Sequence, residues 1–146
     1  MSFQGYLIRV ASSENSNNWY TIPHSLIAEG AYDATYSALD SNSSRNGNGV
    51  LDRNVLPHKV AHCTIGLREN LTESEIGQLF GASGGISTRY ANSLEKSIYV
   101  KMWIPEENDY VTSLCYVPDI NFKIKQIKQN PPEIKYASAT LEFIGY

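Results

Sequence analysis

The chain has 146 residues, which is enough for one domain with a hydrophobic core of its own, and we expect a single domain over residues 1–146. A net charge of −3 gives no overall attraction to nucleic acid or anionic lipid. We therefore expect no specific nucleic-acid partner, and the absence of an apolar run of about 18 residues predicts no membrane span. Two cysteines, Cys63 and Cys115, are too few for a disulfide framework and suit a reducing compartment.

Strand patterns dominate the first part of the chain. Apolar residues alternate over residues 5–10, which predicts a short strand, and a second segment of strand character follows at 19–24. Residues 28–41 could form a helix on propensity. Gly30, Thr35 and the alternation of small and β-favouring residues instead favour a strand, and the helix stays open as the alternative.

The same alternation continues to the end of the chain. It predicts strands over 59–67, 97–104, 110–117, 121–127 and 135–146, with a turn at the prolines between the last two. The strand over 110–117 is apolar on both faces, as in a strand covered on both sides. The residues predicted to share one side of a strand are Ala61, Cys63, Ile65 and Leu67; Ile98, Val100, Met102 and Ile104; and Ala137, Ala139, Leu141 and Phe143.

One short helix is predicted at about 73–80. Thr72 is expected to cap it, with Glu75 three residues later as the second half of a capping box, and Gly81 ends it. Two turns do not hold together alone in water, so this helix must pack on the sheet. The glycine-rich segment 81–85 is interpreted as a flexible joint within the domain.

A glycine-rich stretch at residues 43–67 allows two interpretations. Its sequence is SSRNGNGVLDRNVLPHKVAHCTIGL, which could hold a phosphate beside a metal site or form a tight turn between strands. A phosphate loop leads into a helix, whereas here Pro57 and β-branched residues oppose one. The pairs Asn46-Gly47 and Asn48-Gly49 favour a hairpin turn, because both residue types accept positive φ.

Candidate chemical residues are sparse. His58 and His62 on one strand would lie about 13 Å apart, too far to share a metal ion. Cys63 points opposite to His62 on a strand and is interpreted as a small core residue. Lys123, Lys125 and Lys128 are interpreted as one solvated strand face, with a phosphate-binding stripe as the alternative. We expect no catalytic residue, no metal and no cofactor.

Together these patterns predict a mainly β fold: an antiparallel β-sandwich or partly open barrel with one short flanking α-helix at about 73–80 and an extended hairpin near 40–55.

Several phrases together resemble small structural proteins encoded in the tail modules of Firmicutes phages and prophages. The matching stretches are YLIRV, IPHSLIAEGAYDAT, LDSNSSRNGNGVLDRNVLPHKV, ANSLEKSIYVKMWIPEENDYVTSLCYVPDINFKIKQI and TLEFIGY, which span nearly the whole chain. The most specific parts are the hairpin that carries Arg45, Gly49, Leu51 and Arg53, and the segment YVPDINF with the aromatic end FIGY. The doubled Asn-Gly departs from the family pattern and implies a longer turn.

This resemblance implies a non-enzymatic tail-tube-like domain of the tail tube or the distal tail and baseplate. It implies a ring of identical subunits, expected to be hexameric, that contacts neighbouring tail proteins within the virion after assembly in the bacterial cytoplasm. Subunit-interface candidates lie on the hairpin: Arg45, Asn46, Asn48, Leu51 and Arg53. The alternative is a carbohydrate-binding or host-recognition module of the tail tip that exposes Trp19, Trp103 and Tyr110.

Overall fold

The structure is a computed structural model of the whole chain and describes residues 3–40, 44–45, 47–52, 55–81 and 85–146. These residues form twelve strands, one α-helix and two short 3-10 helices. The strands are β1 (Ile8–Ala11), β2 (Tyr20–Thr21), β3 (Ile27–Asp40), β4 (Ser44–Arg45), β5 (Leu51–Asp52), β6 (Val55–Leu67), β7 (Leu71–Thr72), β8 (Ser97–Ile104), β9 (Asp109–Tyr116), β10 (Ile124–Gln129), β11 (Pro132–Tyr136) and β12 (Thr140–Gly145). The helices are α1 (Glu73–Phe80), η1 (His24–Leu26) and η2 (Ile86–Thr88).

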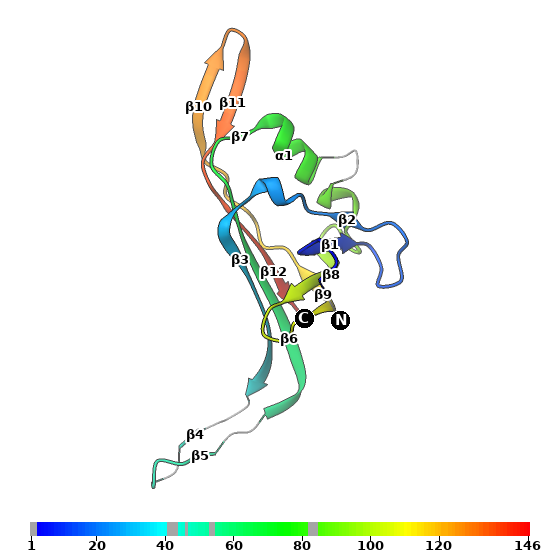
Figure 1. Cartoon of the computed structure of the whole chain (residues 1–146), viewed down its shortest axis with the longest axis vertical. Coiled ribbons are helices and arrows are strands. Elements are labelled where there is room, and N and C mark those ends of the chain that lie inside the picture. The colour runs from blue at the N-terminus through cyan, green and yellow to red at the C-terminus, as the bar shows by residue number, and fades with distance from the viewer. Residues whose placement is uncertain (1–2, 41–43, 46, 53–54, 82–84) are drawn as a thin grey trace.

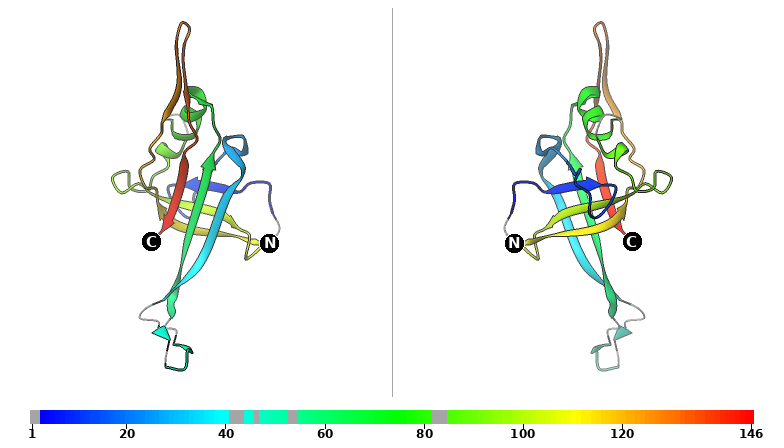
Figure 2. Two further views of the ribbon diagram at one scale, coloured as in Figure 1. Left: turned by 90° about the vertical axis from the view of Figure 1, so that its left-hand side faces the viewer. Right: turned by 90° about the vertical axis from the view of Figure 1, so that its right-hand side faces the viewer.

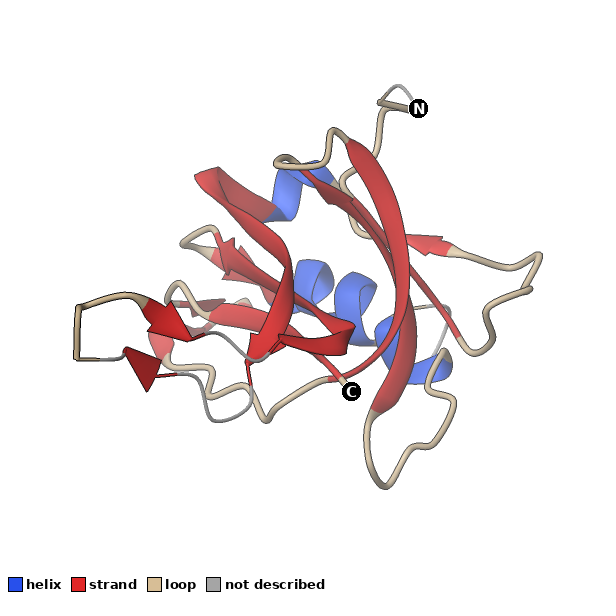
Figure 3. Ribbon diagram, turned by 90° about the horizontal axis from the view of Figure 1, so that it is seen from below, coloured by secondary structure: helices blue, strands red, loops and turns tan. Residues whose placement is uncertain are grey.

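A bent, antiparallel seven-stranded sheet forms the body of the molecule, in the order β2-β1-β8-β9-β12-β6-β3. Strands β3, β6 and β12 run along the long axis, and β1, β8 and β9 cross them (Figures 1 and 2). Seen along the long axis, the strands curl around a common interior (Figure 3). The Tyr32 hydroxyl on β3 donates to the Trp103 carbonyl of β8 at 2.6 Å and so links the two halves of the sheet. The predicted mainly β, sandwich-like fold is confirmed, and the sheet does not close into a barrel.

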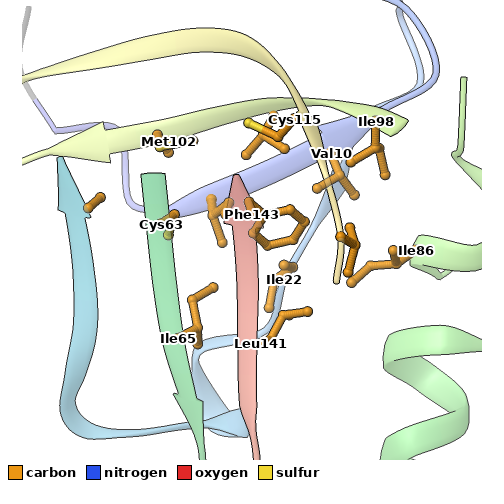
Figure 4. Close-up of a cluster of buried hydrophobic side chains, with 14 of the residues drawn as sticks. Val10, Ile22, Cys63, Ile65, Ile86, Ile98, Met102, Cys115, Leu141 and Phe143 are labelled. Carbon is orange, nitrogen blue, oxygen red and sulfur yellow. The ribbon is translucent and has the colours of Figure 1, made fainter. Parts of the chain in front are cut away.

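The core lies between the two halves of this sheet, where alternate side chains of several strands meet (Figure 4). The predicted alternation of β6 and β8 is confirmed, because the residues predicted to share one side of each strand are all buried. Phe143 of β12 is the largest of the fully buried side chains and stands at the centre of the cluster. These buried residues are Ala61, Cys63, Ile65, Leu67, Ile98, Val100, Met102, Ile104, Leu141 and Phe143.

Residues 28–41, for which a helix was the alternative, lie almost entirely in strand β3. It pairs with β6 from Ile27 to Asp40, and this long-range pairing overrides the helical propensity of the segment. Gly30 has a φ of +71° and lies within the register irregularity between Ile27 and Tyr32. A residue without a side chain adopts this conformation at little cost, so the glycine permits the bulge that turns the strand toward the body.

The predicted helix is confirmed with its cap. Thr72 accepts a hydrogen bond from the Glu75 backbone N–H, and the Glu75 carboxylate accepts one from the Thr72 backbone N–H, each at 3.4 Å. The helix ends at Gly81, whose φ of −66° is extended and not left-handed. Buried Leu79 anchors α1 in the core. The rest of the glycine-rich joint, residues 82–84, lies outside the described residues.

Two strand predictions are wrong in detail. The last strand is not continuous over 135–146, because the chain leaves the three-stranded sheet β10-β11-β7 after Tyr136 and enters the seven-stranded sheet at Thr140. The intervening Ala137 N–H donates to the Lys123 carbonyl at 2.8 Å and takes no place in the β12 ladder. Strand β9 is not covered on both faces: Thr112 is exposed, and Cys115 is its buried residue.

Candidate assembly surfaces

A two-stranded ribbon leaves the body at one end and forms what we call the lower arm (β3, β6 and the β4–β5 hairpin; Figure 1). Strand β12 pairs with β6 from His62 to Gly66, so the earlier part of β6 pairs with β3 alone. The ribbon ends in β4 and β5, which form a separate two-stranded pair. A two-stranded ribbon by itself is marginally stable in water, so this arm would gain stability from a surface that covers it.

The predicted interface residues lie at the tip of the lower arm. Arg45 and Leu51 are paired opposite each other across β4 and β5, which confirms the hairpin near 40–55. Asn48 lies in the exposed turn between them, next to Gly49 with a φ of +79°. Asn46 and Arg53 lie outside the described residues. The hairpin therefore brings Arg45, Leu51 and Asn48 together, and their role as interface residues stays a prediction.

A second ribbon projects from the opposite end of the body and forms the upper arm, β10 and β11 (Figures 1 and 2). All six residues of β10 are exposed, and this strand is an edge of the small sheet. Ile124 and Ile127 are 55% and 65% exposed, which is unusual for two isoleucines on one short strand. Sequence reasoning did not assign them to a site.

Lys123, Lys125 and Lys128 are all exposed, as expected of a solvated face, and Lys128 lies opposite Glu133 on the side of the ribbon away from Ile127; that all three share one face stays a prediction. A bulge between Ile124 and Gln126 breaks the alternation of the strand. The Lys128 ammonium lies 3.7 Å from the Glu133 carboxylate across the arm, and that of Lys125 lies 3.5 Å from Glu69. These exposed pairs contribute little to stability.

An aromatic cluster occupies the outer face of β8 and β9. The ring centroids of Trp103 and Tyr110 lie 5.0 Å apart, and Phe3, 49% exposed, packs edge-on against Trp103 at 5.5 Å. The Tyr110 hydroxyl donates to the Tyr6 carbonyl at 2.7 Å, which fixes the N-terminal segment on this face. Trp19 has no ring contact to this cluster among the described residues, so the three predicted aromatics do not form one platform.

A surface cavity of about 250 Å³ lies between α1 and the segment before β10. Its apolar wall includes Phe80 and Phe122, whose rings pack edge to face with centroids 5.9 Å apart. Lys96 lines its rim and its ammonium lies 2.7 Å from Asp119, which raises the pKa of Lys96 and lowers that of Asp119. The Lys96 ammonium is thus already paired with Asp119, so Lys96 gives the rim of the cavity no unpaired positive charge.

The candidate chemical residues lie in unreactive surroundings. Burial raises the pKa of both thiols, Cys63 and Cys115, to about 12, so each stays protonated at neutral pH. His62 lies on the outer face of β6 with its Nε2 3.6 Å from the Glu142 carboxylate. Within the described residues, no three histidine, cysteine, aspartate or glutamate side chains gather in a way that could hold a metal ion. No helix in this part of the chain is long and apolar enough to cross a membrane.

The chain belongs to a family of unknown function, DUF6711, whose model matches residues 1–146. No curated protein matches the sequence. Among solved structures, the chain is similar to a protein of the tail of an empty gene transfer agent particle with C6 symmetry, with a TM-score of 0.48, 13% identity, and coverage of 100% of this chain and 94% of that one. It is also similar to a protein of the virion of a native gene transfer agent particle, with a TM-score of 0.47, 12% identity and the same coverage. Similarity at these values is too weak to transfer a function.

Proposed function

We propose that this member of the DUF6711 family is a non-enzymatic structural component of a bacteriophage tail, in the tail tube or in the distal tail and baseplate. In this proposal identical subunits assemble as a ring, of six copies as the sequence resemblance implies, and the protein resides in the virion. The sequence resemblance to tail-module proteins suggests the setting. The observation that carries the assembly is the lower arm, a long two-stranded ribbon that projects from the body (Figure 1).

The lower arm favours a protein partner for two physical reasons. Its strands form a two-stranded ribbon, which is marginal by itself and is stabilised when another surface packs on it. Strand β3 is also a long edge of the seven-stranded sheet, and a neighbouring copy that covers this edge would protect its unpaired backbone groups. A head-to-tail contact between identical subunits closes into a ring when the rotation between neighbours permits it.

Arg45 and Arg53 are the side chains we propose for this contact. The planar guanidinium group can bind a carboxylate or two backbone carbonyls of a neighbouring copy while its stem packs on apolar surface. The double variant Arg45→Ala with Arg53→Ala is expected to fold but to enter tails poorly. Electron microscopy and mass spectrometry of purified virions measure the incorporation, and circular dichroism checks the fold.

The matched control removes the same charge from the body of the protein by Arg89→Ala with Lys96→Ala. This control is expected to enter tails at wild-type occupancy, because its residues lie away from the arm. Normal tails that carry the arm variant at full occupancy would refute the role of the two arginines.

A carbohydrate-binding function is the second candidate, and the aromatic cluster favours it. The exposed ring of Phe3 and the half-buried ring of Trp103 present flat apolar faces of the kind that sugar rings stack on. A glycan array probed with the purified protein tests this function. Trp103→Ala should then abolish binding and Trp19→Ala should leave it intact, since Trp19 lies outside the cluster. No glycan bound by the wild-type protein would exclude this candidate.

A further inference from the structure

The upper arm has one apolar face, which the sequence alternation alone does not reveal. In an antiparallel pair, residues directly opposite each other point to the same side. Ile127 lies opposite Ile134 and Ile124 opposite Tyr136, while Ile134 and Tyr136 are two residues apart on β11 and share a side. The bulge between Ile124 and Gln126 supplies the extra residue that brings Ile124 and Ile127 to this same side. We call these four residues the arm stripe.

The arm stripe is covered at its base and bare toward its tip. Tyr136 lies opposite the buried Leu71 of β7, and its ring packs against Phe122 with centroids 5.8 Å apart. Phe122 in turn packs on the hydrophobic core. Further out, the arm extends beyond α1 and the body (Figure 1). Ile127, which pairs with Ile134 nearer the turn of the arm than the Ile124–Tyr136 pair, is 65% exposed. The base of the stripe is therefore continuous with the hydrophobic core, whereas its outer part is left exposed by the described residues of this chain.

The charge of the upper arm limits what can cover this stripe. Residues 123–136 contain four lysines and one glutamate and so carry +3, which leaves −6 on the rest of a chain whose total is −3. Two such arms placed side by side would repel each other through their lysines. A symmetric arm-to-arm contact is therefore disfavoured, and the net charge of the arm favours an acidic surface as its cover.

The same chain carries an acidic surface of this kind at its β8–β9 turn. Glu106 and Glu107 are exposed in this turn, and Asp109 follows them at the start of β9. The aromatic cluster, with exposed Phe3 and half-buried Trp103, borders the turn and supplies apolar area next to these carboxylates. Two cations also lie nearby: Lys59, 3.6 Å from Glu107, and Lys101, 5.8 Å from the Tyr110 ring centre. The turn lies on the side of the body away from the upper arm (Figure 1).

We propose that the arm stripe docks on a second copy of this chain, head to tail, with its isoleucines against the aromatic cluster and the positive charge of the arm beside the carboxylates of the β8–β9 turn. Lys128 lies on the other side of the ribbon from Ile127, so this attraction acts across the arm and not through direct contact on the stripe. The inference rests on the proposed function in one respect, since both require the chain to assemble with itself. It names a surface and an orientation that the lower-arm contact does not include. The upper arm is basic and the β8–β9 turn is acidic, so contact between arm and turn is favoured over contact between two arms or two turns.

Sedimentation velocity of the purified full chain, at concentrations up to about 1 mM, tests the docking. The wild-type protein is expected to form oligomers as its concentration rises. Ile127→Asp should weaken this association by roughly tenfold to a hundredfold, the equivalent of one large apolar side chain left unburied. Leu94→Asp is the matched control: Leu94 is 95% exposed on a turn outside the stripe, and its replacement should change nothing. A monomer throughout the range, or equal loss in both variants, would overturn the proposal.

Charge reversal tests the pairing of the two surfaces. Lys125→Glu with Lys128→Glu reverses the arm, and Glu106→Lys with Glu107→Lys reverses the turn. Each variant alone should lose association. An equimolar mixture should regain it, because each reversed surface then meets its opposite on the other variant. A mixture that stays monomeric would show that these surfaces do not pair.

Virion analysis separates this inference from the proposed function. If the protein is present in tails and Ile127→Asp enters them at wild-type occupancy, the docking inference fails and the proposed function stands. If the charge-reversed mixture associates but the protein is absent from virions, the proposed function fails and the docking stands. If the wild type is monomeric but Ile127→Asp is excluded from tails, the arm binds a different tail protein, and the assignment of a second copy is wrong.

Discussion

The cap of α1 offers a test of how the upper arm is joined to the body. Thr72 has two roles: its side chain accepts the hydrogen bond of the Glu75 backbone N–H, and its backbone lies in β7, opposite Lys135 of the arm. The Glu75 carboxylate also pairs with the Arg68 guanidinium, so the cap belongs to a small polar network. Thr72→Ala removes the acceptor of the first turn and leaves the backbone pairing with the arm in place.

The cost of this change is the loss of one N-cap, about 1 kcal/mol of unfolding free energy. For a domain of this size, that corresponds to a fall in melting temperature of about 3 °C. Thr72→Ser keeps the hydroxyl group and is expected to melt within about 1 °C of the wild type, since serine is an equally good cap. Thermal unfolding followed by circular dichroism gives both values. Equal melting temperatures for Thr72→Ala and the wild type would show that the Thr72 hydroxyl does not cap the helix.

Two further predictions concern the core. Phe143→Ala should lower the free energy of unfolding by about 3–5 kcal/mol in urea titrations, because it opens a cavity at the centre of the buried cluster; a loss below about 1 kcal/mol would place Phe143 outside the core. Cys63 and Cys115 should resist iodoacetamide at pH 8 in the folded protein and react in urea, because burial raises the pKa of both thiols from 9.0 to about 12. The folded state holds the two thiol protons more tightly than the unfolded state does. The free energy of unfolding should therefore keep its full value below about pH 9 and fall as the pH rises toward 12. Urea titrations that show no such fall would contradict this prediction.

The alternation of apolar residues was sufficient to predict most of the fold. In β8, the faces of Ile98, Val100 and Met102 follow directly from period two, because one side of the strand meets the core and the other does not. The capping box at Thr72 and Glu75 fixed the start of α1 in the same local way. These features depend on neighbours in the sequence, which is why the sequence alone identified them.

The arm stripe could not be predicted from the sequence because it depends on pairing. Ile124 and Ile127 are three residues apart, so strict alternation assigns them to opposite faces of a strand. The bulge beside Gln126 places them together, and a bulge is a property of the register between two strands. The break after Tyr136 was missed for a similar reason: the chain changes sheets there, although its residues from 135 onward keep strand-like composition.

The docking of the upper arm also bears on which tail structure the chain would form. A single head-to-tail contact either closes into a ring or continues as an open filament, according to the rotation between neighbours. A tube requires two different contacts between subunits. One contact closes each ring, and the other joins one ring to the next. In the proposals above, the lower arm supplies the first contact and the arm stripe the second, and the two arms project from opposite ends of the body, as contacts in different directions require (Figure 1). A ring at the distal end of a tail needs no repeated contact between copies along the axis. Ile127→Asp therefore distinguishes the two settings: in a tube it should shorten or abolish the tail, whereas in a single distal ring it should leave the tail length unchanged.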